Sequence, residues 1–278
     1  DNGSQDGTGA WLRSAAPDVA VVSLERNLGF AEGCNRGIAA AGDVDWIATL
    51  NDDARPDPGW IGALRAAAAA AAPSVGMLQA EVLRGADREV VASRGVEICR
   101  DGVLRDLGAG QPATPLTGSR EIFGVSAAAA LYRRAMLDGL RIRSGVFDRG
   151  CFAYFEDVDL GWRARLAGWQ AQLVPGARVL HAEHASAVRM PAGFLARQTR
   201  RNRVRVLLKN ASPRFLLRAA PRLARDVAAA ALADPREVGA WLAAALDGAR
   251  QRRDVSRLVR VPRREVERRW IDTAAAGP

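Results

Sequence analysis

The sequence predicts an α/β fold with a mixed, mostly parallel sheet, helices on both faces, and a basic helical tail. Short β-branched or apolar runs alternate with helical stretches up to residue 181, Gly- and Pro-containing loops separate them, and basic residues are concentrated after residue 195. Such alternation is typical of α/β sheets, which bind ligands at the carboxyl ends of their strands. We expect one α/β domain over 1–210 and a basic amphipathic helical tail over 211–278.

The expected elements follow in chain order. "VAVVSL" at 19–24 and "DWIATL" at 45–50 are predicted strands, with a Gly-rich loop and helix between them at 27–41. The later elements are a helix at 60–72, irregular strands and turns at 75–125, a strand entering a helix at 124–137, a helix at 154–168 that Gly168 ends, and a strand at 170–181. Each assignment rests on hydrophobic period and on Gly or Pro punctuation.

Charge and cysteine content narrow the class of protein. Residues 1–195 carry 20 basic and 23 acidic groups, whereas residues 196–278 carry 20 and 8. Three widely spaced cysteines favour a reduced cytosolic setting, and no apolar run reaches the roughly 18 residues of a membrane helix. We expect a cytoplasmic protein. Nucleic acid is an unlikely partner, because the Arg-rich end has too few aromatic residues for base stacking and the body is acidic.

Asp52 and Asp53 directly follow the predicted strand "WIATL" and Asn51. They therefore stand at the carboxyl end of a strand, where α/β sheets place their chemistry. A turn-forming, helix-capping cluster explains them equally well from the residues alone.

A second acidic group, Glu156, Asp157 and Asp159, follows "CFAYF" and opens a helix. Acids in a first turn favour the helix dipole, and Asp159 with Arg163 is an i,i+4 pair, so helix stability alone could explain them. Capping does not require the aromatic wall, however. Carboxylates beside aromatic rings are partly desolvated, which raises their pKa and suits a general base.

His181 ends the strand "ARVLH", and His184 follows in "HAEH". A lone histidine is usually structural. A zinc site is disfavoured here, because the cysteines are not spaced to complete one.

Six segments in this order resemble glycosyltransferase family 2, the inverting enzymes of the GT-A fold, and within it the bacterial rhamnosyltransferase-like branch. The segments are "DNGSQDGT" at 1–8, "RNLGFAEGCNRGI" at 26–38, "LNDDARPDPGWI" at 50–61, "YFEDVDLGWRARLAGW" at 154–169, "VPGARVLH" at 174–181 and "RNRVRVLLKN" at 201–210. Each is weak alone, and together they cover residues 1 to about 210.

The resemblance implies a role for each matching position on the donor side. Asp1 would face the pyrimidine of the nucleotide-sugar, and Asn27, Gly29 and Asn35 would approach the nucleotide and ribose. Asn51, Asp52 and Asp53 stand where the family has its Asp-x-Asp element, with Asp53 as the direct ligand of Mn²⁺ or Mg²⁺, Asp52 as a supporting contact and His181 as a further metal ligand. An imidazole ligand leans toward Mn²⁺.

On the acceptor side, the resemblance makes Asp157 the catalytic base and gives Glu156 an orienting role. Single-displacement inversion needs a carboxylate that takes the proton of the acceptor hydroxyl. The segment 124–132 would line the acceptor side.

The branch suggests dTDP-L-rhamnose as donor and a polyprenyl-diphosphate-linked saccharide as acceptor, with UDP-hexose donors left open. In such enzymes the DNGS-type turn follows the second strand, so we expect two further strands and a helix before it. A chain without them would expose buried strand edges and be unstable. Two alternatives stay open: a truncated non-catalytic homologue that binds a membrane or a partner, and a sugar nucleotidyltransferase, which would need a phosphate loop at the first strand.

The tail carries two apolar stripes. One consists of Leu216, Ala220, Leu223 and Val227, opposite Arg218, Arg222 and Arg225, and the other of Val238, Trp241, Leu242, Ala245 and Leu246. A basic amphipathic pair could lie on the anionic inner face of the plasma membrane, or both stripes could pack on the body or on a second subunit. Pro221 is expected to kink or start its helix.

Overall fold

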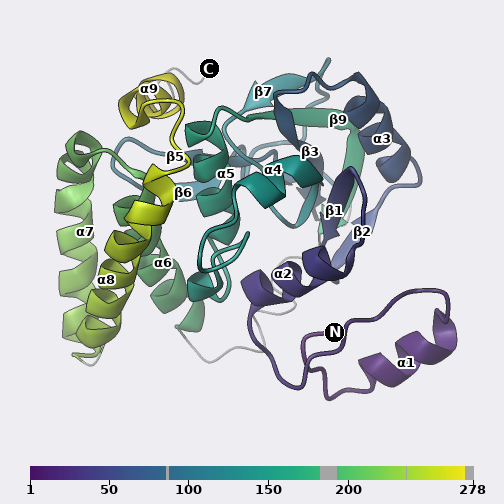
Figure 1. The fold of residues 1–278 in the computed structure, drawn as a ribbon, viewed down its shortest axis with the longest axis horizontal. Coiled ribbons are helices and arrows are strands. Elements are labelled where there is room, and N and C mark those ends of the chain that lie inside the picture. Colours follow the sequence, from purple (N-terminus) through teal and green to yellow (C-terminus); the bar gives the residue numbers. More distant parts are fainter. Residues whose placement is uncertain (86–87, 182–192, 236, 273–278) are drawn as a thin grey trace.

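The computed structural model describes residues 1–85, 88–181, 193–235 and 237–272. A mixed sheet forms the centre of the molecule, α3 lies on one side of it, and the long C-terminal helices stand together at the other end (Figure 1). The predicted α/β fold with a helical C-terminal region is therefore confirmed.

The main sheet runs in the order β1-β8-β3-β9-β2, with β4 paired to β3 and β7 paired to β9. The strands are β1 (Trp46–Leu50), β2 (Ala54–Pro56), β3 (Val75–Arg84), β4 (Val90–Ser93), β5 (Val96–Ile98), β6 (Leu104–Asp106), β7 (Arg120–Ile122), β8 (Ala129–Arg133) and β9 (Gln170–His181). β5 and β6 form a separate two-stranded sheet.

The expectation of a mostly parallel sheet needs correction. In the described residues only β3 and β9 pair in parallel, from Val75↔Gln170 to Leu83↔Leu180, and the other strand pairs are antiparallel. The reason is β8, which lies between β1 and β3 and runs against both. The crossover through α3 does make β1 and β3 point the same way, as a strand-helix-strand unit requires, but it leaves a gap that an antiparallel strand fills.

The helices are α1 (Thr8–Ala15), α2 (Phe30–Ala40), α3 (Trp60–Ala70), α4 (Arg134–Gly139), α5 (Glu156–Leu166), α6 (Phe194–Asn210), α7 (Pro213–Ala233), α8 (Glu237–Ser256) and α9 (Arg263–Glu267). Trp60 and Leu64 of α3 pack on one face of the sheet. Side chains of α2, α4 and α5 pack on the other, including Ile38, Met136 and Leu160.

Helix α5 is buried from Val158 to Leu166 because the sheet core lies on one side and α6, α7 and the 268–272 turn lie on the other. Gly168, with φ +90°, takes the left-handed conformation just after the helix, as predicted. The strand at 46–50, the strand-to-helix passage at 129–139 and the strand at 170–181 are likewise confirmed.

The strand predicted at 19–24 is wrong. This segment forms no ladder: its backbone bonds are Val19 N to Ala16 O at 3.0 Å, and Asp1 N to Val22 O and Leu24 N to Asp1 O, both at 2.9 Å. A β-branched run becomes a strand only when another strand offers it partners, and Val19 remains 57% exposed.

The two apolar stripes of the C-terminal helices differ in burial: the stripe on α7 packs on the body, and the stripe on α8 is partly exposed. Leu216, Leu223 and Val227 of α7 pack against the core, which supports the alternative in which this stripe rests on the body. On α8, Trp241 is buried, but Leu242 and Leu246 are 60% and 56% exposed. Pro221 lies inside α7, which continues through it. Within the described ranges, no helix is both long enough and apolar enough to cross a membrane.

Candidate active site

A cavity of about 610 Å³ opens at the carboxyl ends of β1 and β9. Its walls come from the 27–34 turn, the 50–53 loop, residues 126–128, the 152–158 segment and His181. The cavity therefore collects most of the candidate residues from segments that are far apart in the sequence.

One wall is a turn held by two asparagines. Asn27 Oδ1 accepts the backbone N–H of Gly29 at 2.8 Å and an N–H of Asn2 at 3.2 Å. Asn2 also accepts from Leu28 N at 2.9 Å and donates to Gly29 O at 3.0 Å. Gly29 itself has φ +88°, a conformation that L side chains rarely adopt.

Two predicted donor-side residues lie elsewhere. Asp1 caps its own turn, with Oδ1 accepting Ser4 N at 2.9 Å, and Asn2 rather than Asp1 lines the cavity. Asn35 is buried and bonded to the backbone: its amide donates to Phe147 O and accepts from Val146 N and Phe147 N. The structure thus places Asn35 as a brace between α2 and the 146–147 backbone, not at the cavity.

Asn51, Asp53 and His181 meet on a second wall because β2 pairs with the end of β9, Ala54 opposite His181. His181 Nε2 lies 2.9 Å from Asp53 Oδ1 and 3.2 Å from Asn51 Nδ2. One ring nitrogen cannot donate to the carboxylate and accept from the amide at once, and the buried Asn51 Oδ1 has no partner. The predicted metal residues are thus brought together, and Asp52 lines the cavity beside them.

These oxygen and imidazole groups fit a divalent cation that takes further ligands from a bound diphosphate. Among the described residues, no cluster of three or more His, Cys, Asp or Glu side chains could hold a metal ion by itself. An ion bound by Asp53 and His181 would therefore need further ligands other than the described His, Cys, Asp or Glu side chains.

Glu156 and Asp157 form the third wall at the start of α5, where Glu156 is buried and Asp157 is partly buried. Burial raises the pKa of each, and the negative charge of Asp157 raises that of Glu156 further. Asp157 nevertheless accepts two backbone N–H bonds, from Ala127 at 3.2 Å and Val158 at 2.7 Å, whereas Glu156 Oε2 has no partner. Backbone donors stabilise a carboxylate, so Asp157 is the group that ionises first and Glu156 retains its proton.

The aromatic segment before this pair has a strained backbone. Phe152, Tyr154 and Phe155 all have positive φ, at 58°, 71° and 69°. Each such residue costs on the order of 1–3 kcal/mol and persists only when its surroundings fix it, a condition typical of functional sites.

The known proteins that this chain resembles are glycosyltransferases. Residues 1–141 match the family model described as Glycosyl transferase family 2. Two curated proteins of Mycobacterium tuberculosis, from strains CDC 1551 and H37Rv, are 34% identical over 218 residues, which is 70% of this chain and 69% of theirs. Both are N-acetylglucosaminyl-diphospho-decaprenol L-rhamnosyltransferases.

The chain belongs to glycosyl transferase family 2.

Its fold also resembles a solved glycosyltransferase. The crystal structure of GalNAc-T7 with UDP, GalNAc and Mn²⁺ aligns with a TM-score of 0.54 at 15% identity, over 74% of this chain and 40% of that one. At this identity the likeness shows the fold alone, the GT-A type that the sequence motifs imply.

Sequence reasoning missed two residues of this glycosyltransferase cavity. Asn2 belongs to the segment "DNGSQDGT", but the family resemblance implies no role for it. Cys34 lines the cavity, and burial, followed by the charges of Glu156 and Asp157, raises the pKa of its thiol to about 12. The helical period placed Cys34 on α2, but only the fold brings α2 against the acidic pair.

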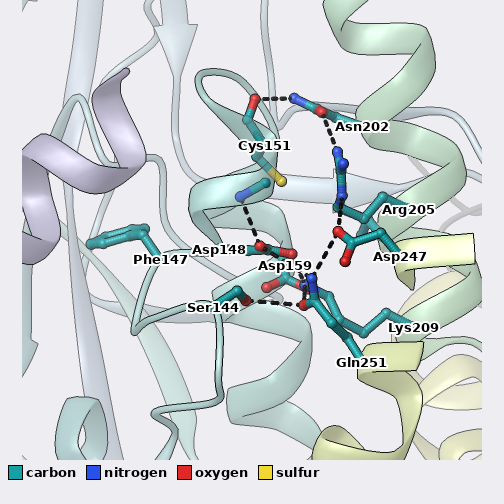
Figure 2. A network of polar contacts seen from close by, with 12 residues as sticks. Ser144, Phe147, Asp148, Cys151, Asp159, Asn202, Arg205, Lys209, Asp247 and Gln251 are labelled. Carbon is teal, nitrogen blue, oxygen red and sulfur yellow. Dashed lines mark hydrogen bonds and ion pairs between the residues drawn. The ribbon is translucent and has the colours of Figure 1, made fainter. Parts of the chain in front are cut away.

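The single lysine of the chain also has a place that composition could not reveal. Lys209 of α6 is fully buried and contacts Asp148, Asp159 of α5 at 2.9 Å and Gln251 of α8 at 3.2 Å (Figure 2). Burial alone would lower the pKa of this amine, but the two carboxylates raise it. Lys209 thereby links the helix that carries the acidic pair to the C-terminal helices.

Proposed function

We propose that this glycosyltransferase transfers L-rhamnose from dTDP-rhamnose, with inversion, to a saccharide linked to a polyprenyl diphosphate. The observation that carries the proposal is Asp157, a shielded carboxylate that two backbone N–H groups keep ionisable inside the cavity that also holds Asp53 and His181. The relatives named as decaprenol-linked rhamnosyltransferases support the donor and the acceptor class.

In this reaction the acceptor hydroxyl oxygen bonds to the anomeric carbon of the donor while the bond from that carbon to the diphosphate oxygen breaks. Asp157 takes the hydroxyl proton, and the nucleoside diphosphate leaves with the bonding electrons. Burial and the charge of Asp157 raise the pKa of Glu156, which favours its protonated form, and a protonated Glu156 can donate a hydrogen bond to the acceptor without competing for the same proton.

Asp53 and His181, with the unpartnered oxygen of Asn51, would hold a divalent ion, Mn²⁺ in preference to Mg²⁺. A bound ion would offset the negative charge that builds on the leaving diphosphate. Asn2, Asn27 and Gly29 would hold the nucleotide, as backbone and amide groups of a tight turn suit a ribose and its base.

The acceptor carries a lipid in this proposal, so the enzyme would work peripherally at the cytoplasmic face of the plasma membrane. The exposed Leu242 and Leu246 on the basic C-terminal helices support a contact with an anionic surface. A second copy of the chain is the competing occupant of this face.

The test is release of dTDP from dTDP-rhamnose, with N-acetylglucosaminyl-diphospho-polyprenol as acceptor. We compare the wild-type protein with Asp157→Asn, each with Mn²⁺ and with a chelator. Release should need the metal and should fall by about 10²- to 10⁴-fold in the variant, the usual contribution of a general base.

A UDP-hexose that supports release where dTDP-rhamnose does not would correct the donor and keep the reaction. No release from dTDP, UDP or GDP sugars by a cooperatively folded protein would favour the non-catalytic alternative.

A further inference from the structure

One segment of the cavity wall, residues 151–155 before the acidic pair, has a backbone conformation that its own residues do not favour. Three of the four non-glycine residues with positive φ in the described ranges are Phe152, Tyr154 and Phe155. No glycine relieves this stretch, so contacts from outside must hold it.

Asn202 of α6 supplies three of those contacts. Asn202 is fully buried, and its Nδ2 donates to Cys151 O at 2.8 Å, Ala153 O at 2.8 Å and Tyr154 O at 2.7 Å. Since an amide has two N–H bonds, the three carbonyls must converge tightly on it. Gln198, one turn earlier on α6, also donates to Cys151 O at 2.5 Å.

Arg205 and Asp247, on the side of Asn202 away from the loop, fix the orientation of the Asn202 amide. Its Oδ1 accepts from Arg205 Nη1 at 3.0 Å, and Arg205 in turn donates to Asp247 Oδ2 of α8 at 2.9 Å (Figure 2). A guanidinium can only donate, so the amide oxygen must face Arg205 and the nitrogen must face the loop.

The loop at 151–155 contacts α2 at one end and continues into the acidic pair of α5 at the other. Phe152 O accepts Ala31 N at 3.1 Å in the first turn of α2, beside the turn that Asn27 and Gly29 form. At its other end the loop leads directly into Glu156 and Asp157. One carbonyl cluster therefore sets the position of the nucleotide-side turn relative to the acidic pair.

We propose that Asn202 is a positioning residue, which holds residues 151–155 in the backbone conformation, with positive φ at Phe152, Tyr154 and Phe155, that presents Asp157 to the cavity. It touches no reacting atom and acts through the backbone carbonyls. This inference rests on the proposed function for its catalytic consequence, but not for the holding of the loop.

The test compares the wild type with Asn202→Asp and with Ser212→Ala. Asn202→Asp keeps the shape and the contact to Arg205 but turns acceptors toward the carbonyls. Ser212→Ala is the control: Ser212 is equally buried and bonded to Phe215 N and Glu267, away from the loop.

Two quantities are measured, amide hydrogen exchange of peptides covering 149–158, and kcat and KM for the donor. In Asn202→Asp we expect exchange in 149–158 to quicken by about tenfold and kcat to fall by about ten- to a hundredfold, more than KM changes, because small displacements of a base cost rate. Ser212→Ala should leave both quantities near wild type after a similar loss of thermal stability.

The proposal is overturned if exchange in 149–158 is unchanged, or if the loop loosens and kcat stays at the wild-type value. Should Asn202→Asp fail to fold, Gln198→Leu removes a single bond to Cys151 O and should lower kcat by roughly threefold; an unchanged kcat there also overturns it. If the wild type transfers no sugar, the proposed function fails, while the exchange data alone decide whether Asn202 holds the loop.

Discussion

The backbone carbonyl of Phe152 fills the space beside Gly29 where any other residue would carry its Cβ. A Cβ built on Gly29 would stand 2.5 Å from that oxygen and 2.6 Å from the Phe152 ring. The turn at 27–29 and the aromatic loop at 152–155 can therefore pack this closely only because Gly29 has no side chain.

Gly29→Ala should therefore weaken nucleotide binding and destabilise the fold. The positive φ and the clash with a backbone atom together cost about 1–3 kcal/mol. The measurements are thermal unfolding and equilibrium binding of dTDP.

Gly37→Ala is the control, within α2, the helix that directly follows Gly29. Gly37 is exposed, and a Cβ there meets nothing within 4 Å, so helix propensity should make this variant more stable by roughly 0.5–1 kcal/mol. Equal behaviour of the two variants would mean that the contact with Phe152 is unimportant.

Glu156→Gln should stabilise the fold at neutral pH while lowering transfer. Burial and the neighbouring Asp157 raise the pKa of Glu156, so its stabilising contribution is complete below the unfolded pKa of about 4.3 and is lost as pH rises toward the folded pKa. Glutamine does not titrate. The stability gain of the variant should therefore be near zero at pH 4 and grow with pH.

Unfolding in urea at pH 4, 6 and 8 measures this gain. A constant difference between Glu156→Gln and wild type across the three pH values would contradict the assignment of Glu156 as the protonated partner.

Lys209→Met should destabilise the protein strongly. Removing the amine leaves Asp148 and Asp159 buried without the cation they share, and breaking a buried ion pair in this way typically costs about 3–5 kcal/mol. Chemical denaturation gives the value.

Arg257→Met serves as the control, because that side chain is 82% exposed and lies 4.0 Å from Asp254. It should change the free energy of unfolding by about 0.5 kcal/mol or less. A loss in Lys209→Met no larger than this would show that the buried carboxylates find other compensation.

The double variant Leu242→Ser, Leu246→Ser should bind vesicles of anionic phospholipid roughly tenfold more weakly than wild type, since two exposed apolar side chains leave the interface. Ile61→Ser on α3, 46% exposed in the wild type, should bind as wild type does. If the double variant instead dissociates a dimer without changing vesicle binding, the face is a contact between copies of the chain.

Local patterns in the sequence were sufficient for several elements and for much of the cavity. The run "WIATL", the acidic start of α5 with its Gly168 stop, and the strand that ends at His181 are all readable from hydrophobic period and end signals. Because strand ends and first turns are defined locally, Asp53, Asp157 and His181 could be placed on the cavity side before any contact was known.

Three assignments could not be made in that way. The β-branched run at 19–24 is no strand because pairing requires a second strand. The inserted β8 pairs antiparallel with both of its neighbours, so the mixed sheet is not mostly parallel. Asn35 looks like a nucleotide ligand by position, yet the backbone 112 residues further on takes up its amide.

The sequence by itself determined the family, the order of most elements and the acidic residues at strand and helix ends, because these depend on neighbours along the chain. Only the tertiary structure decided what Asn202 and Lys209 do. The backbone carbonyls that Asn202 contacts lie 48–51 residues away, and the partners of Lys209 lie 42–61 residues away. A buried polar side chain acquires its role from whichever unpaired groups the fold brings within hydrogen-bonding distance.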